Sequence, residues 1–248
     1  MKVLISGAMG FMGREVAKLC AAQGVEVVAG VDIVSGQADF PLYTDYENVP
    51  AADVIIDFSN WKPGADLLDY AVKHQVPAVI CATGLSEEQL QRIDEASRVI
   101  PVFRSGNMSL GIALVRSLIR RAATVLGEDF DVEIVEMHHN RKVDAPSGTA
   151  LMLYDAVKDV YDQPREVKGG RYGRDSKRQH NEIGIHAVRG GTITGEHQVG
   201  FYGPSERITI SHSAENRALF ATGALRAAEF LIGQEPGMYS MDDVIGTL

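Results

Sequence analysis

Residues 2–13 read Lys2-Val3-Leu4-Ile5-Ser6-Gly7-Ala8-Met9-Gly10-Phe11-Met12-Gly13, and they give the strongest indication of the fold. The apolar run at 2–6 predicts a buried strand, and residues from about 14 to 23 predict a helix. Between them the first glycine permits a tight turn, the second lets the backbone approach a pyrophosphate, and the third allows close helix–strand packing. A strand, a glycine-rich turn and a helix in this order predict a dinucleotide-binding fold.

The free N–H groups of such a turn, together with the helix dipole, favour a phosphate. The predicted cofactor contacts are Gly7, Ala8, Met9, Gly10, Phe11, Met12 and Gly13. Asp32 follows Gly13 by 19 residues, at the end of a second predicted strand at 25–31, where an acid accepts hydrogen bonds from the adenosine ribose. Three glycines can also serve a plain turn, and Asp32 can be an ordinary turn aspartate.

The sequence predicts NADH as the preferred cofactor, with NADPH possible. No lysine or arginine occurs between Asp32 and Lys62. The 2′-phosphate of NADPH would therefore face a carboxylate without a cation nearby in sequence.

Short apolar runs alternate with amphipathic stretches through the first hundred residues. Further strands are expected at 53–58, 76–81 and 99–103, and further helices at about 63–74 and 86–97. Ser86 and Gln89 have the spacing of a capping box at the start of the last of these helices. This alternation predicts βαβ units and a parallel sheet with right-handed crossovers.

Two segments follow predicted strands at the end where ligands bind in open α/β sheets. We predict that they contact the nicotinamide ribose, although both can be simple strand-to-helix turns. They consist of Cys81, Ala82 and Thr83, and of Ser105, Gly106, Asn107 and Met108.

The pattern changes after residue 106. Helices are expected at 109–126 and 147–161, strands at 131–137, 182–189, 192–201 and 206–213, a mobile loop at 161–178 and a final helix at 214–232. The first of these helices should have Leu110, Leu114, Leu118 and Ile119 on one apolar face. Strands that follow one another without helices indicate an α+β arrangement.

The predicted fold is therefore α/β with two domains. Residues 1–108 and 215–248 should form a Rossmann-like dinucleotide-binding domain, to which the final helix returns. Residues 109–214 should form an α+β domain, with hinges near residues 108–109 and 214–215.

The net charge of −9 argues against nonspecific nucleic-acid binding. No window approaches 18 apolar residues, and the first apolar run is too short for a signal peptide, so we expect no membrane contact. Cys20 and Cys81 lie in apolar runs and suggest buried thiols in a cytoplasmic protein.

The segment at 136–150 contains a basic cluster in an otherwise acidic chain. It reads Glu136-Met137-His138-His139-Asn140-Arg141-Lys142-Val143-Asp144-Ala145-Pro146-Ser147-Gly148-Thr149-Ala150. Ser147 can cap a helix whose first turn contains Gly148 and Thr149, and such a helix start suits a carboxylate. Cations beside a helix N-terminus indicate a small dianion. A solvated basic loop is an alternative; a metal site lacks a third ligand at the usual spacing.

This segment, E-M-H-H-N-R-K-V-D-A-P-S-G-T-A, resembles the signature E-x-H-H-x-x-K-x-D-A-P-S-G-T-A of the dihydrodipicolinate reductase family. The resemblance extends to G-A-M-G-F-M-G-R near the N-terminus and to D-F-S at 57–59. It also includes residues 189–191, 195–197 and 211–217, so that it covers nearly the whole chain.

The resemblance implies reduction of the cyclic dicarboxylate made from pyruvate and aspartate semialdehyde to tetrahydrodipicolinate, with loss of water, in lysine and diaminopimelate synthesis. It assigns acid–base roles to His138 and Lys142, and leaves open which of them delivers the proton. It assigns substrate binding to His139, Ser147, Gly148 and Thr149, and implies that the domain at 109–214 binds the substrate and assembles a homotetramer. Some relatives carry a basic residue where this chain has Ile33, which again favours NADH.

Two other functions compete with this one. One is a different nicotinamide enzyme of the same architecture, such as an amino-acid dehydrogenase, against which the H-H-x-x-K and S-G-T segments count. The other is a redox-sensing module that binds NADH without chemistry, which would not need the basic cluster.

Overall fold

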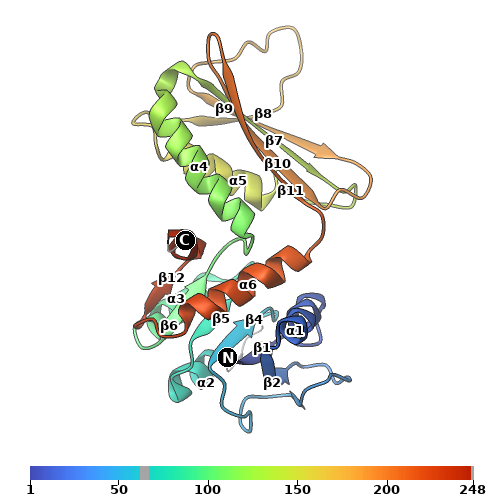
Figure 1. Cartoon of the computed structure of the whole chain (residues 1–248). Helices are drawn as coiled ribbons and strands as arrows, with labels where there is room; N and C mark the ends of the chain where they lie inside the picture. The colour runs from blue at the N-terminus through green and yellow to red at the C-terminus, as the bar shows by residue number, and fades with distance from the viewer. Residues whose placement is uncertain (62–66, 247–248) are drawn as a thin grey trace. The chain divides into compact units, whose positions relative to one another are not determined.

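The computed structural model describes residues 1–61 and 67–246, and the chain divides into two compact units (Figure 1). The first unit comprises Met1–Leu110 and Arg217–Leu248, and the second comprises Gly111–Asn216. Both boundaries fall two residues beyond the expected ones. The roles of the two domains remain a prediction.

The first unit is built on a seven-stranded, fully parallel sheet in the order β12-β6-β5-β4-β1-β2-β3. Its strands are β1 (Lys2–Ser6), β2 (Glu26–Val31), β3 (Leu42–Tyr43), β4 (Val54–Asp57), β5 (Ala78–Ile80), β6 (Pro101–Arg104) and β12 (Gly237–Tyr239). Its helices are α1 (Phe11–Gln23), α2 (Leu67–His74), α3 (Glu87–Ser97), α6 (Ala218–Leu231) and α7 (Met241–Gly246). The strand order reverses at β1, so the carboxyl ends of β1 and β4 form the switch point where ligands bind in such sheets.

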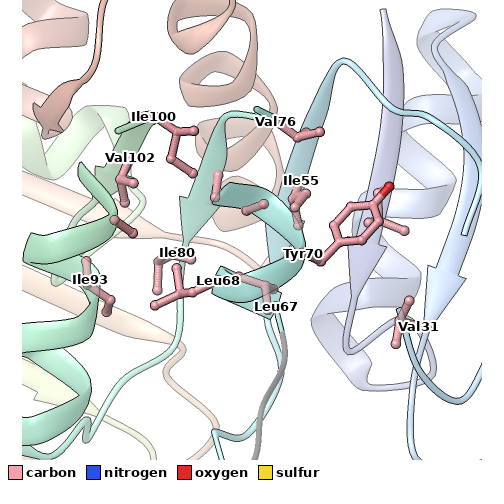
Figure 2. Close-up of a cluster of buried hydrophobic side chains, with 14 of the residues drawn as sticks. Val31, Ile55, Leu67, Leu68, Tyr70, Val76, Ile80, Ile93, Ile100 and Val102 are labelled. Carbon is pink, nitrogen blue, oxygen red and sulfur yellow. The ribbon is translucent and has the colours of Figure 1, made fainter. Parts of the chain in front are cut away.

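The core of the first unit forms where α2 and α3 meet the sheet (Figure 2). Leu67 and Leu68 of α2 and Ile93 of α3 are buried against strand residues such as Ile55 and Ile80. Burying each of these side chains contributes roughly 1.5–3 kcal/mol. Helix α6 packs against α1 and against strands β4, β5 and β6.

Most predicted elements of this unit are present, with shifted ends. Helix α1 begins at Phe11, earlier than residue 14, because Gly10 is its N-cap. The capping box of Ser86 and Gln89 is confirmed. The first part of the predicted helix at 63–74 lies outside the described residues. Strands β3 and β12 were not predicted, because runs of two or three residues carry no usable periodicity.

The second unit is built on a mixed five-stranded sheet in the order β11-β10-β7-β9-β8. Its strands are β7 (Asp131–His138), β8 (Glu166–Gly169), β9 (Glu182–Arg189), β10 (Gly195–Tyr202) and β11 (Arg207–Ala214). The sheet is accompanied by α4 (Leu110–Leu126), the 3₁₀ turn η1 (Gly127–Asp129) and α5 (Gly148–Lys158). Residues from both helices share a core with alternate residues of β7.

The apolar face predicted for α4 is only partly right. Ile119 is buried as expected, but Leu114 and Leu118 are 53% and 46% exposed, and Val115 is buried instead. The helix carries apolar residues on two faces, so periodicity alone could not select the one that packs.

The prediction of a loop throughout 161–178 is also wrong, because β8 lies within it and pairs with β9. All four residues of β8 are exposed, so this edge strand lacks the apolar alternation by which strands are recognised. Among the residues that the structure describes, no helix combines the length and apolarity needed to cross a membrane.

Candidate functional site

The glycine-rich turn in the first unit has the close contacts that require glycine. Gly7 has φ +73°, and a Cβ there would lie 2.7 Å from the Ser59 nitrogen. A Cβ at Gly13 would collide with the carbonyl oxygen of Gly7 and lie 2.8 Å from Ala8 Cα. Phe11, Met12 and Gly13 form the first turn of α1, where backbone N–H groups have no intrahelical acceptor. The turn therefore presents the N–H groups that a phosphate requires.

Asp32 lies directly after β2 and is tied to this turn. Its Oδ2 accepts the Met9 N–H at 2.8 Å, and its Oδ1 accepts the Val34 N–H at 3.1 Å. Each oxygen keeps acceptor capacity, so ribose hydroxyls can still bind. A cavity of about 1440 Å³ opens here, and Asp32 lines it together with Gly7, Ala8, Met9 and Gly10.

The same cavity is lined by two cations that the sequence reasoning missed. Arg14 and Lys18 lie on α1, and Lys18 is paired with Glu15 at 2.7 Å. Both residues precede Asp32 in the sequence, so a search for cations after Asp32 could not find them. Their positions could have revealed them, because Arg14 and Lys18 are four residues apart on the helix that follows the glycine turn and therefore lie on one face of it.

The segments at 81–83 and 105–108 lie at the carboxyl ends of β5 and β6, outside the residues that line the cavity. Cys81 donates its backbone N–H to the Asp57 carbonyl, and burial, then the Asp57 charge, raise the pKa of its thiol well above the ordinary value. Cys81 therefore remains a neutral thiol. The Ser105 hydroxyl donates to the Asn107 carbonyl at 2.8 Å, and Met108 is buried.

In the second unit, the fully buried carboxylate of Glu136 is hydrogen-bonded to several residues of the predicted site. Glu136 Oε2 lies 2.6 Å from His138 Nδ1, and Arg189 donates to both Glu136 oxygens at 2.7 and 2.6 Å. The Ser147 N–H donates to Glu136 Oε1 at 3.0 Å. We call Glu136, His138, Ser147 and Arg189 the Glu136 network. Burial acts to raise the pKa of Glu136, but these donors outweigh it and hold the pKa below its ordinary value.

The network also fixes the start of α5. Ser147 is the N-cap, and its Oγ accepts the Ala150 N–H at 3.1 Å. His197 Nε2 lies 3.0 Å from the same Oγ, and the tautomer of the ring decides which of the two groups donates. Burial, then nearby His138, lowers the pKa of His197 to about 4, which keeps its ring neutral at ordinary pH. Gly148 and Thr149 follow in the first turn of the helix.

The basic loop between β7 and α5 carries the remaining predicted residues. Lys142 Nζ is 2.8 Å from Asp144 Oδ1, and this hydrogen bond is the main cause of a lowered pKa at Asp144. The Lys142 N–H donates to the His139 carbonyl, and the His139 N–H donates to the Ile193 carbonyl. Arg141 is exposed. The loop thus keeps the Lys142 side chain partly exposed, at 21%, while its backbone is anchored.

Gly195 lies against the His138 ring. A Cβ there would lie 3.0 Å from His138 Nε2, so only glycine leaves that nitrogen its present room. The His138 and His197 rings meet edge to face, with centroids 5.2 Å apart. With Nδ1 facing Glu136, Nε2 is the nitrogen that can exchange a proton with a ligand.

The sequence reasoning did not assign roles to Glu136, Arg189 or His197, although all three lie in segments that carry the family resemblance. Arg189 and His197 come from β9 and β10, and local sequence gives no sign that both flank β7. The arrangement combines an imidazole, an ammonium and a helix N-terminus. It can bind a carboxylate and deliver a proton beside it.

Comparison with known proteins finds similar proteins over nearly the whole chain. The family model described as "Dihydrodipicolinate reductase, N-terminus" matches residues 1–108, and "Dihydrodipicolinate reductase, C-terminus" matches residues 111–245. A protein named 4-hydroxy-tetrahydrodipicolinate reductase from Caldanaerobacter subterraneus is 55% identical over 98% of both chains. One of the same name from Clostridium novyi is 44% identical over 98% of both chains. A dipicolinate-bound dihydrodipicolinate reductase from Paenisporosarcina sp. TG-14 has the same fold, with TM-score 0.79, 24% identity and 98% coverage of each chain.

Proposed function

The chain belongs to the dihydrodipicolinate reductase family and reduces 4-hydroxy-tetrahydrodipicolinate to tetrahydrodipicolinate with a nicotinamide cofactor, and we propose how its residues divide this work. The reaction is a step of lysine and diaminopimelate synthesis. The observation that carries the proposed roles is the Glu136 network, which joins an imidazole to the start of a helix.

The first unit holds the cofactor, whose chemical contribution is a hydride. The fit rests on the glycine turn, whose shape a Cβ at Gly7 or Gly13 would distort by clashing with neighbouring backbone, so that only glycine gives the tight turn on which a pyrophosphate can lie. Asp32 accepts the ribose hydroxyls, and the segments at 81–83 and 105–108 contact the nicotinamide ribose. The neutral thiol of Cys81 suits such a contact, because it adds no charge.

NADH is the preferred cofactor. The carboxylate of Asp32 is held in place by two N–H groups, and the exposed Ile33 follows it, so a 2′-phosphate would meet a fixed negative charge. Arg14 and Lys18 line the same cavity and offset part of this repulsion, which leaves NADPH usable.

The second unit binds the cyclic dicarboxylate. The first turn of α5 offers N–H groups of Gly148 and Thr149 to one carboxylate, and the Ser147 cap fixes that turn. Lys142 and His139 bind the substrate from the loop. The Lys142 ammonium exchanges its Asp144 partner for a substrate carboxylate.

His138 and Lys142 supply the acid–base chemistry. The Glu136 carboxylate stabilises the charged imidazolium and orients it through Nδ1, so that Nε2 faces the ligand. A hydride enters the substrate ring, a proton is added and water leaves, so the reaction balances with one NAD(P)H and one proton. A positioned acid of this kind contributes roughly 10²–10⁴-fold.

We place the enzyme in the cytoplasm as a homotetramer. Both cysteines are free thiols, which suits a reducing compartment. The face of the second sheet opposite its core carries the exposed side chains of Val188 and Tyr202, which a neighbouring subunit would cover. Light scattering on the purified protein measures the subunit number.

The decisive assay follows NADH absorbance after substrate is generated in the cuvette from aspartate semialdehyde and pyruvate. Rapid NADH loss that depends on both precursors supports the proposal. Tight NADH binding without turnover would instead favour the redox-sensing module, and turnover with an amino acid and NAD would favour an amino-acid dehydrogenase.

A further inference from the structure

Asp57 is a buried acid that the proposed chemistry does not use. It is the last residue of β4 and is 0% exposed. It pairs in register with Ser6 of β1, so it lies at the carboxyl ends of the two strands that flank the switch point of the sheet. A buried carboxylate is expensive unless donors satisfy it, and its position therefore needs an explanation.

The donors to Asp57 come mainly from one short segment. Its Oδ1 accepts the Ser59 N–H at 3.0 Å, and its Oδ2 accepts the Trp61 indole N–H at 2.6 Å. The Ser6 hydroxyl also hydrogen-bonds to the Asp57 carboxylate, and its oxygen accepts a hydrogen bond from the Tyr46 hydroxyl at 2.9 Å. Burial raises the pKa of Asp57, and these donors oppose that rise.

The segment held in this way, residues 58–61, forms a wall of the dinucleotide cavity. Phe58, Ser59 and Asn60 line it. The segment touches the glycine turn directly, since a Cβ on Gly7 would lie 2.8 Å from the Phe58 carbonyl carbon. Gln89 of the α3 capping box donates to the Trp61 carbonyl at 3.1 Å and fixes the far end of the segment.

We propose that Asp57 is a positioning residue for the cofactor: its two oxygens hold residues 58–61 against the glycine turn and so give the cavity a fixed wall. The proposal rests on the proposed function, in which this cavity holds the dinucleotide. It requires a carboxylate, because two N–H donors bind separate oxygens. Asparagine offers one acceptor and one NH₂ group, so one of the two donors would face another donor.

The test compares Asp57→Asn with Asp53→Asn. Asp53 precedes β4 at its opposite end and accepts the Lys2 N–H at 2.6 Å, so the control removes the same charge from the same unit. Asp57→Asn should raise the KM for NADH about tenfold, with kcat and the KM for the dicarboxylate within about twofold of the parent. Asp53→Asn should leave all three unchanged.

A spectroscopic readout is available because Trp61 is the single tryptophan of the chain. Its emission should shift in Asp57→Asn and stay at the parental wavelength in Asp53→Asn. If NADH fails to quench the emission of the parent protein and the parent shows no turnover, the proposed function fails. If the parent binds NADH and Asp57→Asn matches Asp53→Asn in KM and emission, the positioning role of Asp57 is overturned.

Trp61→Phe keeps the proposal testable if Asp57→Asn does not fold. This substitution removes only the indole N–H and retains an aromatic ring. It should raise the KM for NADH about fivefold at unchanged kcat, measured by NADH absorbance. An unchanged KM for NADH would overturn the proposal.

Discussion

Replacing Glu136 by glutamine tests whether the Glu136 network serves the chemistry. Glutamine keeps an oxygen for the two donors at Oε1, from Ser147 and Arg189. It places an NH₂ group where Oε2 accepts His138 at 2.6 Å and Arg189 at 2.7 Å. Two charge-assisted bonds are lost in a fully buried position, at about 1.5–3 kcal/mol each. We expect about 4 kcal/mol lower stability, within the roughly 3–5 kcal/mol typical of a broken buried pair.

The same change should lower kcat about 100-fold, at the lower end of what a positioned acid contributes. Without the carboxylate the His138 imidazolium loses its counter-charge, and the Nδ1 proton that orients the ring loses its acceptor. Urea unfolding followed by circular dichroism gives the stability, and initial NADH oxidation at saturating substrates gives kcat.

Glu133→Gln is the matched control. Glu133 lies on the opposite face of the same strand, where its carboxylate accepts His186 at 2.7 Å, Arg171 at 3.3 Å and Arg178 at 3.2 Å. It is 19% exposed at the side chain, so its loss should cost less, about 1–2 kcal/mol, and leave kcat within about twofold. If both variants keep the same kcat, the network is structural only and our argument is wrong.

Three further outcomes follow from the site. The pKa of His197 drops from 6.5 to about 4 on folding, so between these pH values the unfolded chain binds a proton that the folded chain does not. The free energy of unfolding should therefore fall by about 2 kcal/mol from pH 7 to pH 5. Urea unfolding of His197→Gln should show a weaker dependence of stability on pH. Lys142→Ala should lower kcat about 100-fold while quenching of Trp61 by NADH persists, and near-normal turnover would remove Lys142 from the mechanism. The kcat/KM for NADH should exceed that for NADPH, and Arg14→Ala should lower only the NADPH value; a strong NADPH preference of the parent would refute the role given to Asp32.

Much of the first unit could be predicted because its signals are local. The strand at residues 2–6, the glycine turn and the capping box of Ser86 each depend on neighbours within a few residues. Arg14 could not be predicted as a cavity residue from the segment after Asp32, because it lies on the helix that begins at Phe11. The exposed edge strand β8 was missed because burial, which creates the apolar pattern, is absent there.

The site in the second unit could be predicted only in part, because its geometry is set by strand register. The parallel pairing of β7 with β9 places Arg189 opposite His138, and the antiparallel pairing of β7 with β10 places His197 opposite Glu136. A slip of one residue in either pair would move the partner side chains to the other face of the sheet. The motif at 136–150 therefore supplies the acid, the imidazole and the helix cap. Arg189, which pairs with the buried Glu136, lies on β9, a strand that begins more than 40 residues after β7 ends. It follows that the geometry proposed for proton delivery by His138 exists only once β9 and β10 have paired with β7, and that mutations which shift either register should abolish turnover without changing the motif itself.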